Sequence, residues 1–198
     1  MKLYTVAAST INVISRILWR ASAVGRENVP LHGPLIVACN HRSYLDPPVM
    51  GSFCPRQVHF MAKRELFAIP LLGSAIAAVG AYPVDREGTA TAAIKRSVEV
   101  LRAGGCIGIF PEGTRNLGGD APVRMGVALL ASLAKAPVVP ACIVGGNRAK
   151  RLGRIKVAFG PPMSLPPDRK ATRDELAKFT DEVMGAIAAL AEKIGGDS

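Results

Sequence analysis

The chain has few aromatic side chains, and it lacks the short motifs that mark several large enzyme classes. Aromatic residues make up 5% of its 198 residues, with one tryptophan and three tyrosines. Proteins that bind single-stranded nucleic acid stack bases on aromatic side chains, so this scarcity argues against a nucleic-acid partner. The chain has no G-x-G-x-x-G or Walker A sequence, which leaves nucleotide binding unsupported. It has no G-x-S-x-G sequence either, which leaves a serine hydrolase unsupported.

The four cysteines show no metal-binding pattern. They lie at positions 39, 54, 106 and 142 without a C-x-x-C pair, and no histidine is spaced as a zinc partner. Three of them fall in expected strands or at strand ends, where cysteine is usually a small buried hydrophobic residue. We therefore expect reduced cysteines, a cytosolic setting and no metal or other cofactor.

The first 20 residues lack an apolar run long enough to cross a bilayer. Arg16 interrupts the apolar stretch after Lys2, so about 20 consecutive apolar residues are not available. No small-residue cleavage site follows, which argues against a signal peptide. Apolar residues instead recur at helical spacing, at positions 3, 6, 7, 11, 14, 17 and 18. This pattern predicts an amphipathic helix over residues 1–20, which either lies in a membrane interface or packs on the core.

The charge of the chain favours anionic partners. Its formal net charge is +10 and its mean hydropathy is +0.25. A phospholipid surface, a phosphorylated substrate, coenzyme A and nucleic acid are all compatible with that charge. A basic run near the C-terminal third is either a solvated loop or a contact for anionic lipid or an acidic carrier. It comprises Arg148, Lys150, Arg151, Arg154 and Lys156.

Short apolar runs alternate with helical segments along residues 21–198. Strands are expected at 35–39, 58–61, 80–84, 106–109, 138–144 and 156–159, and the main helices at 89–103, 123–134 and 171–194. Runs of that length between turn residues are typical of buried strands. The alternation predicts one α/β domain, with a mostly parallel sheet flanked by helices.

Polar clusters follow two of these strands directly. Asn40 to Asp46 follows the strand at 35–39, and Phe110 to Arg115 follows the strand at 106–109. In α/β sheets the ligand crevice lies beyond the carboxyl ends of the strands. The two clusters therefore indicate one candidate site.

His41 and Asp46 form a candidate general-base pair in the first cluster. Histidine titrates near neutrality, so it can accept and return a proton under cellular conditions. Asp46 follows five residues later at an expected helix start, where its carboxylate can orient the imidazole. No serine nucleophile accompanies the pair, which suits direct attack by a substrate hydroxyl. The simpler alternative is a turn histidine followed by an aspartate that only caps the helix as its N-cap residue.

The second cluster offers groups that suit a phosphate. Arg115 carries a planar fork of donors, Thr114 adds a hydroxyl, and Gly113 lets the backbone approach closely. Glu112 precedes them, and a solvated Glu112–Arg115 ion pair in an ordinary turn is the alternative. Two further cations, Lys63 and Arg86, also follow expected strands. Each is either a solvent-facing charge or a ligand of the same anion.

Four sequence blocks in this order resemble the glycerolipid acyltransferase family, in particular its 1-acyl-sn-glycerol-3-phosphate acyltransferase branch. Asn40-His41 with Asp46 matches N-H-x-x-x-x-D, and residues 110–115 match F-P-E-G-T-R in full. Residues 82–86 and 139–143 resemble the second and fourth blocks. The resemblance covers about residues 22–165. Asn116 and Arg124-Met125-Gly126 depart from the common pattern.

The resemblance implies acyl transfer from a thioester, either acyl-CoA or acyl carrier protein, to the free hydroxyl of a lysophospholipid. His41 would deprotonate the hydroxyl and Asp46 would orient His41. Arg115, Arg86 and Lys63 would hold the acceptor phosphate, and Glu112, Gly113 and Thr114 would shape that pocket. Backbone N–H groups near Val139 would stabilise the oxyanion.

The resemblance also bears on where the enzyme works. A lipid acceptor favours the membrane alternative for residues 1–20, with residues 21–198 as the acyltransferase domain. We therefore expect a peripheral or monotopic protein on the cytoplasmic face of the cell membrane. The same chemistry on another lysolipid, such as a lyso-ornithine lipid, stays open. So does a non-catalytic binder of anionic lipid, while the oligomeric state is left undetermined.

Overall fold

The structure is a computed structural model that describes residues 2–84, 90–111, 121–166 and 171–195. Its strands are β1 (Ser22–Val24), β2 (Leu35–Cys39), β3 (Val58–Lys63), β4 (Tyr82–Val84), β5 (Cys106–Ile109), β6 (Val138–Val144) and β7 (Lys156–Phe159). Its helices are α1 (Lys2–Trp19), α2 (Asp46–Phe53), α3 (Arg64–Phe67), α4 (Leu72–Ala78), α5 (Ala90–Arg102), α6 (Ala121–Ala134) and α7 (Arg173–Gly195), with 3₁₀ turns η1 (Arg26–Asn28) and η2 (Gly146–Arg151).

The strands form one mostly parallel sheet. Within the described residues its order is β1-β7-β6-β2-β5-β3-β4. β6, β2, β5, β3 and β4 run parallel to one another, whereas β7 is antiparallel to β6 and carries β1 parallel to itself. The predicted α/β architecture with a largely parallel sheet is confirmed, and the strands at 35–39, 106–109, 138–144 and 156–159 have the predicted bounds.

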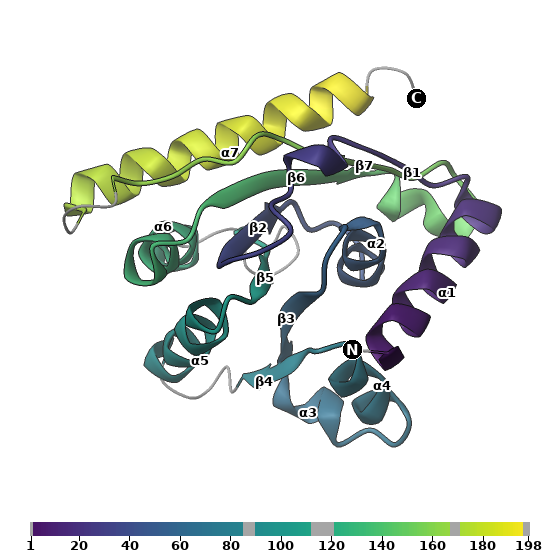
Figure 1. Cartoon of the computed structure of the whole chain (residues 1–198). Coiled ribbons are helices and arrows are strands. Elements are labelled where there is room, and N and C mark those ends of the chain that lie inside the picture. Colours follow the sequence, from purple (N-terminus) through teal and green to yellow (C-terminus); the bar gives the residue numbers. More distant parts are fainter. Residues whose placement is uncertain (1, 85–89, 112–120, 167–170, 196–198) are drawn as a thin grey trace.

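The central strands are buried on both faces because helices cover the sheet on each side. Every residue of β2 and β5 is buried. Alternate residues of β2 point to opposite faces, so Leu35, Val37 and Cys39 join one core and Ile36 and Ala38 join the other. Helices α1 and α2 cover the first face, and α5, α6 and α7 cover the second (Figure 1). This two-sided burial accounts for the continuous apolar runs in the sequence.

Helix α1 packs on α2 with one side and exposes apolar side chains on the other. The Tyr4 hydroxyl donates to the Gly51 carbonyl at 3.2 Å, and the Asn12 side-chain amide donates to the Ser52 carbonyl at 3.1 Å. The exposed apolar side chains are Leu3, Val6, Val13, Ile14, Ile17 and Leu18. The terminal helix therefore packs on the domain with one side and exposes apolar side chains on the other, and its place in a membrane interface stays a prediction. None of the described helices is both long and apolar enough to cross a membrane.

The carboxyl ends of the parallel strands meet at one edge of the sheet. Ala38 of β2 pairs with Ile109 of β5, and Cys39 pairs with Ala141 of β6. Antiparallel β7 begins at the same edge, where Lys156 pairs with Val144. The polar segments that follow β2, β5 and β6 therefore start next to one another, as expected from the positions of the polar clusters.

Candidate active site

His41 and Asp46 are in contact just beyond the end of β2. His41 Nδ1 lies 3.2 Å from Asp46 Oδ2, and the two side chains are 15% and 2% exposed. A carboxylate only accepts hydrogen bonds, so Nδ1 is the donor in this contact. The predicted return of Asp46 to one imidazole nitrogen is confirmed. In the neutral form of the ring with its proton on Nδ1, Nε2 is the nitrogen that can accept a substrate proton.

Asp46 does not cap α2, contrary to the simpler alternative. The cap residue is Leu45, and Asp46 is the first helical residue. An N-cap side chain at position 46 would need amide donors at positions 48 and 49. Pro48 has no N–H, and the Val49 N–H already donates to the Leu45 carbonyl at 3.0 Å. The carboxylate therefore turns back toward the residues that precede the helix.

Backbone amides fix the carboxylate in that backward position. Arg42 N and Ser43 N donate to Asp46 Oδ2 at 2.6 and 2.7 Å. Together with His41 Nδ1, three donors converge on a single buried oxygen atom. Hydrogen bonds to a charged acceptor are among the stronger ones in proteins, so Asp46 is held in place before any substrate binds. The Ser43 hydroxyl accepts from Leu45 N at 3.2 Å, consistent with a structural rather than nucleophilic serine.

Two phenylalanines hold the imidazole ring from the β5 and β3 side. The Phe110 ring stacks on His41 with centroids 4.3 Å apart, and Phe60 stacks on Phe110 at 6.1 Å. Gly108 makes this possible, because a Cβ there would lie 2.3 Å from the Phe60 ring. The sequence reading gave Phe110 no role and did not single out Phe60. A glycine inside an otherwise apolar strand is a signal of close approach that could have found the stack.

Asn40 ties the end of β2 to β6. Its side chain accepts from Ile143 N at 2.8 Å and donates to the Ile143 carbonyl at 3.0 Å, and it is 8% exposed. This paired contact fixes the residue next to His41 against the neighbouring strand. The asparagine of the first sequence block therefore has a positioning role that its motif alone did not reveal.

The loop after β6 lies directly against Asp46. A Cβ added to Gly146 would be 2.6 Å from Asp46 Oδ1 and 3.3 Å from Ser43 Cβ. Only glycine leaves room for this carboxylate oxygen, so the loop and the His41–Asp46 pair are packed as one unit. Sequence reasoning passed over Gly146 because a glycine in a loop has many ordinary explanations.

The other predicted site residues are only partly within the described chain. Lys63 is the last residue of β3 and is exposed at the same sheet edge, beside Val84 of β4. Arg86 and the segment Glu112, Gly113, Thr114 and Arg115 lie outside the described residues. Their roles stay predictions. Their nearest described neighbours, the ends of β4 and β5, lie on the same side of β2 as Lys63.

Val139 itself lies inside the sheet. It is fully buried in β6 and pairs with Val37 of β2. The expected role of backbone N–H groups near Val139 in stabilising the oxyanion stays a prediction.

Comparisons with known proteins agree with the fold and with the sequence blocks. The family model named Acyltransferase matches residues 20–144. The chain is 32% identical to the 1-acyl-sn-glycerol-3-phosphate acyltransferase of Bacillus subtilis, over 97% of this chain and 98% of that protein. It is also 32% identical to the enzyme of that name from Streptococcus pneumoniae, where the match covers 77% of this chain but only 56% of the relative.

A solved structure shares the fold. The crystal structure of the 1-acyl-sn-glycerophosphate acyltransferase from Thermotoga maritima superimposes with a TM-score of 0.70, covering 92% of this chain and 79% of that one at 24% identity. The chain therefore belongs to the acyltransferase family, and the resemblance drawn from the four sequence blocks is confirmed. It is an O-acyltransferase.

Proposed function

We propose that the chain transfers a fatty acyl group from a thioester to the sn-2 hydroxyl of 1-acyl-sn-glycerol-3-phosphate, forming phosphatidic acid. The observation that carries the proposal is the buried Asp46 carboxylate, held by two amides and directed at His41 Nδ1. The name shared by the Bacillus subtilis and Streptococcus pneumoniae relatives supports the choice of acceptor.

The proposed step needs no covalent acyl-enzyme and no cofactor. His41 Nε2 accepts the proton of the acceptor hydroxyl while that oxygen attacks the thioester carbonyl. The new C–O ester bond forms, the C–S bond breaks, and the proton on Nε2 passes to the departing thiolate. Asp46 keeps its negative charge and stabilises the imidazolium that exists between the two proton transfers. A thioester is already an activated acyl donor, so a positioned base suffices.

The acceptor phosphate would bind on the β5, β3 and β4 side of His41. Lys63 lies at that edge, and Arg86 and Arg115 follow β4 and β5 in the sequence. A phosphate suits such a group of cations, and Arg115 can bind it in a bidentate manner. An acceptor without phosphate, such as a lyso-ornithine lipid, would make little use of these residues.

Thiol release from palmitoyl-CoA, with and without lysophosphatidate, tests the reaction. We expect acceptor-dependent release from the wild type and a loss of about two to four orders of magnitude in His41→Ala. His32→Ala is the matched control, because His32 is an exposed loop histidine that precedes β2, whereas the pair follows β2. Release that does not need the acceptor would indicate a thioesterase instead. Equal rates in wild type and His41→Ala would exclude general-base catalysis by His41.

The choice of acceptor has its own test. With lysophosphatidate, Lys63→Ala and Arg115→Ala should raise KM by about tenfold or more, because each loses a charge-assisted contact with the phosphate. Equal rates for lysophosphatidate and a phosphate-free lysolipid, both insensitive to Arg115→Ala, would contradict the proposed acceptor.

We further propose that the protein binds the cytoplasmic surface of the cell membrane peripherally through α1. The apolar stripe of α1 faces outward while its other side packs on α2. The net charge of +10 favours an anionic lipid surface. Such a position would place the sheet edge within reach of a lipid acceptor.

A further inference from the structure

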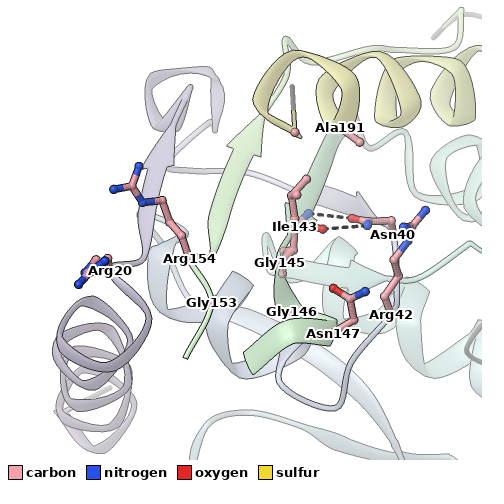
Figure 2. A pocket seen from close by; sticks show the side chains of 12 residues that line it. Arg20, Asn40, Arg42, Ile143, Gly145, Gly146, Asn147, Gly153, Arg154 and Ala191 are labelled. Atoms are coloured by element: carbon pink, nitrogen blue, oxygen red, sulfur yellow. Dashed lines mark hydrogen bonds between the residues drawn. The ribbon is translucent and has the colours of Figure 1, made fainter. Parts of the chain in front are cut away.

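A cavity of about 540 Å³ adjoins the His41–Asp46 pair through Gly146, which lines the cavity and lies against Asp46. It is bounded by the ends of β2 and β6, the start of β7 and the C-terminal end of α7 (Figure 2). Asn40 and Arg42, the neighbours of His41 in sequence, both line it. Its volume is within the range of small-molecule sites, which is about 300–1,000 Å³.

Three arginines make the lining of this cavity basic. Arg42 and Asn147 line one end of the cavity, and Arg20 and Arg154 line the other (Figure 2). None of the lining residues that the structure describes is acidic. Among the described residues, no carboxylate forms an ion pair with any of the three guanidinium groups. A cavity lined by unpaired guanidinium groups suits phosphate, which arginine can bind in a bidentate manner.

The fold holds Arg20 at the cavity in an unfavourable backbone conformation. Its φ of +46° lies in the left-handed region that favours glycine or asparagine. On either side of it, Ile155 N donates to the Trp19 carbonyl and Ser22 N donates to the Ile155 carbonyl, each at 3.1 Å. These bonds fix the end of α1 against the segment that carries Arg154. The left-handed conformation itself is common at helix ends, and Lys135 and Leu152 adopt it directly after α6 and η2. The two backbone bonds are therefore what places Arg20 beside the segment that carries Arg154.

The sheet order places this cavity on the other side of β2 from Lys63, the described residue of the predicted acceptor site. β5, β3 and β4 lie on one side of β2, and β6, β7 and β1 lie on the other. The phosphate-binding residues predicted for the acceptor follow β3, β4 and β5. The cavity belongs to β6 and β7. A transfer reaction brings two substrates to one base, so the second side is available for the acyl donor.

We propose that this cavity holds the phosphate end of the phosphopantetheine arm of the acyl donor. Acyl-CoA and acyl carrier protein both carry their thioester on this arm, so they share the chemistry that the arginines recognise. The proposal rests on the proposed acyl transfer and names its donor site. In the bound state the thioester reaches His41, its C–S bond breaks, and the thiol leaves with the proton from Nε2. This proposal also assigns a role to Arg154, which is one residue of the basic run in the sequence.

The test is equilibrium binding of CoA, holo acyl carrier protein and lysophosphatidate to the full chain by titration calorimetry. In the double variant Arg20→Gln/Arg154→Gln we expect affinity for at least one phosphopantetheine ligand to fall by about tenfold or more. Affinity for lysophosphatidate should not change. Arg20→Lys/Arg154→Lys should recover part of the loss because it restores the charge. Arg96→Gln, which removes an exposed charge from α5, should leave all three affinities unchanged.

A phosphate-free donor separates charge recognition from structural damage. Acyl-pantetheine should react equally well with wild type and the glutamine double variant, while the KM for the phosphorylated donor rises. A loss confined to CoA, or to the carrier protein, supports the proposal and identifies the donor. The proposal would be overturned if the double variant kept its affinity for CoA and for the carrier protein, or if it lost affinity for lysophosphatidate instead. Because binding needs no turnover, an enzyme that binds CoA here yet fails to acylate lysophosphatidate would contradict only the proposed acceptor.

Discussion

Asp46 Oδ2 lies 3.2 Å from His41 Nδ1 while backbone amides of residues 42 and 43 donate to the same oxygen. The carboxylate thus has two separable tasks, which are to hold the turn after β2 and to orient the imidazole. In Asp46→Asn the side-chain oxygen can still accept from the amides, but the charge beside His41 is lost. We expect kcat to fall by about two to four orders of magnitude with little change in thermal stability.

Asp46→Ala is the comparison that separates these tasks. It leaves the two amides without their acceptor and should cost about 1–3 kcal/mol of unfolding free energy for each amide that stays unsatisfied. Steady-state rates and thermal melting on both variants give the answer. An Asp46→Asn enzyme with wild-type kcat would show that Asp46 only supports the turn.

Gly146 leaves room for Oδ1, the second carboxylate oxygen of Asp46. A methyl group at position 146 should therefore disturb catalysis. The added Cβ would lie 2.6 Å from Asp46 Oδ1, so the carboxylate or the loop must move. Because small misplacements of a base reduce rates strongly, we expect kcat of Gly146→Ala to fall by about tenfold or more. Gly185→Ala is the control, since a Cβ on this α7 residue meets nothing within 4 Å. Equal kcat values for both variants would contradict the argument.

The outer stripe of α1 should carry the membrane contact. Leu3, Val6 and Ile17 are 63%, 63% and 72% exposed, so replacing all three with serine leaves the core intact. Full burial of one apolar side chain is worth about 1.5–3 kcal/mol of transfer free energy. If the three side chains insert even partly into the bilayer, their loss should weaken vesicle binding by at least about tenfold. Sedimentation with vesicles that contain an anionic phospholipid measures it.

A second triple variant controls for the loss of apolar surface in general. Val24, Leu31 and Leu152 are 57%, 58% and 63% exposed but lie outside α1. Their replacement with serine should leave vesicle binding unchanged. Serine substitution is preferable to removal of α1, because Trp19 Nε1 donates to the Ala149 carbonyl at 2.9 Å and deletion would break that contact. Equal sedimentation of both variants would exclude α1 as the anchor.

Alkaline pH should destabilise the fold through Cys142. Burial in β6 raises the pKa of this thiol from 9.0 to about 11. Between these values the unfolded chain loses the Cys142 proton and the folded chain keeps it, so unfolding becomes easier as pH rises. The slope from one such group is at most about 1.4 kcal/mol per pH unit. Denaturant titrations at pH 8 to 11 should show a flatter decline in Cys142→Ala. Parallel curves for the two proteins would contradict the raised pKa.

The sequence by itself determined the elements and the family. Apolar runs such as 35–39 and 138–144 predict strands because both faces of those strands are covered, and that burial leaves a continuous hydrophobic signal. The motif residues His41 and Asp46 are close in the chain, so local geometry alone brings them together. Strand ends are less certain from sequence, as the continuation of β3 to Lys63 and the start of β4 at Tyr82 show.

Tertiary structure decided everything that depends on which strands are neighbours. Phe60 and Phe110 reach His41 only because β3 and β5 lie next to β2 in that order, and Gly146 reaches Asp46 only because β6 lies on the other side. Arg20 and Arg154 are more than a hundred positions apart and meet at one cavity. Apart from Gly108, whose position in an apolar strand signals a close approach, such contacts leave no periodic or local signal in the sequence, because they arise from side chains brought together by the strand order. Knowing which strands pair determines these contacts, whereas knowing only which segments are strands does not.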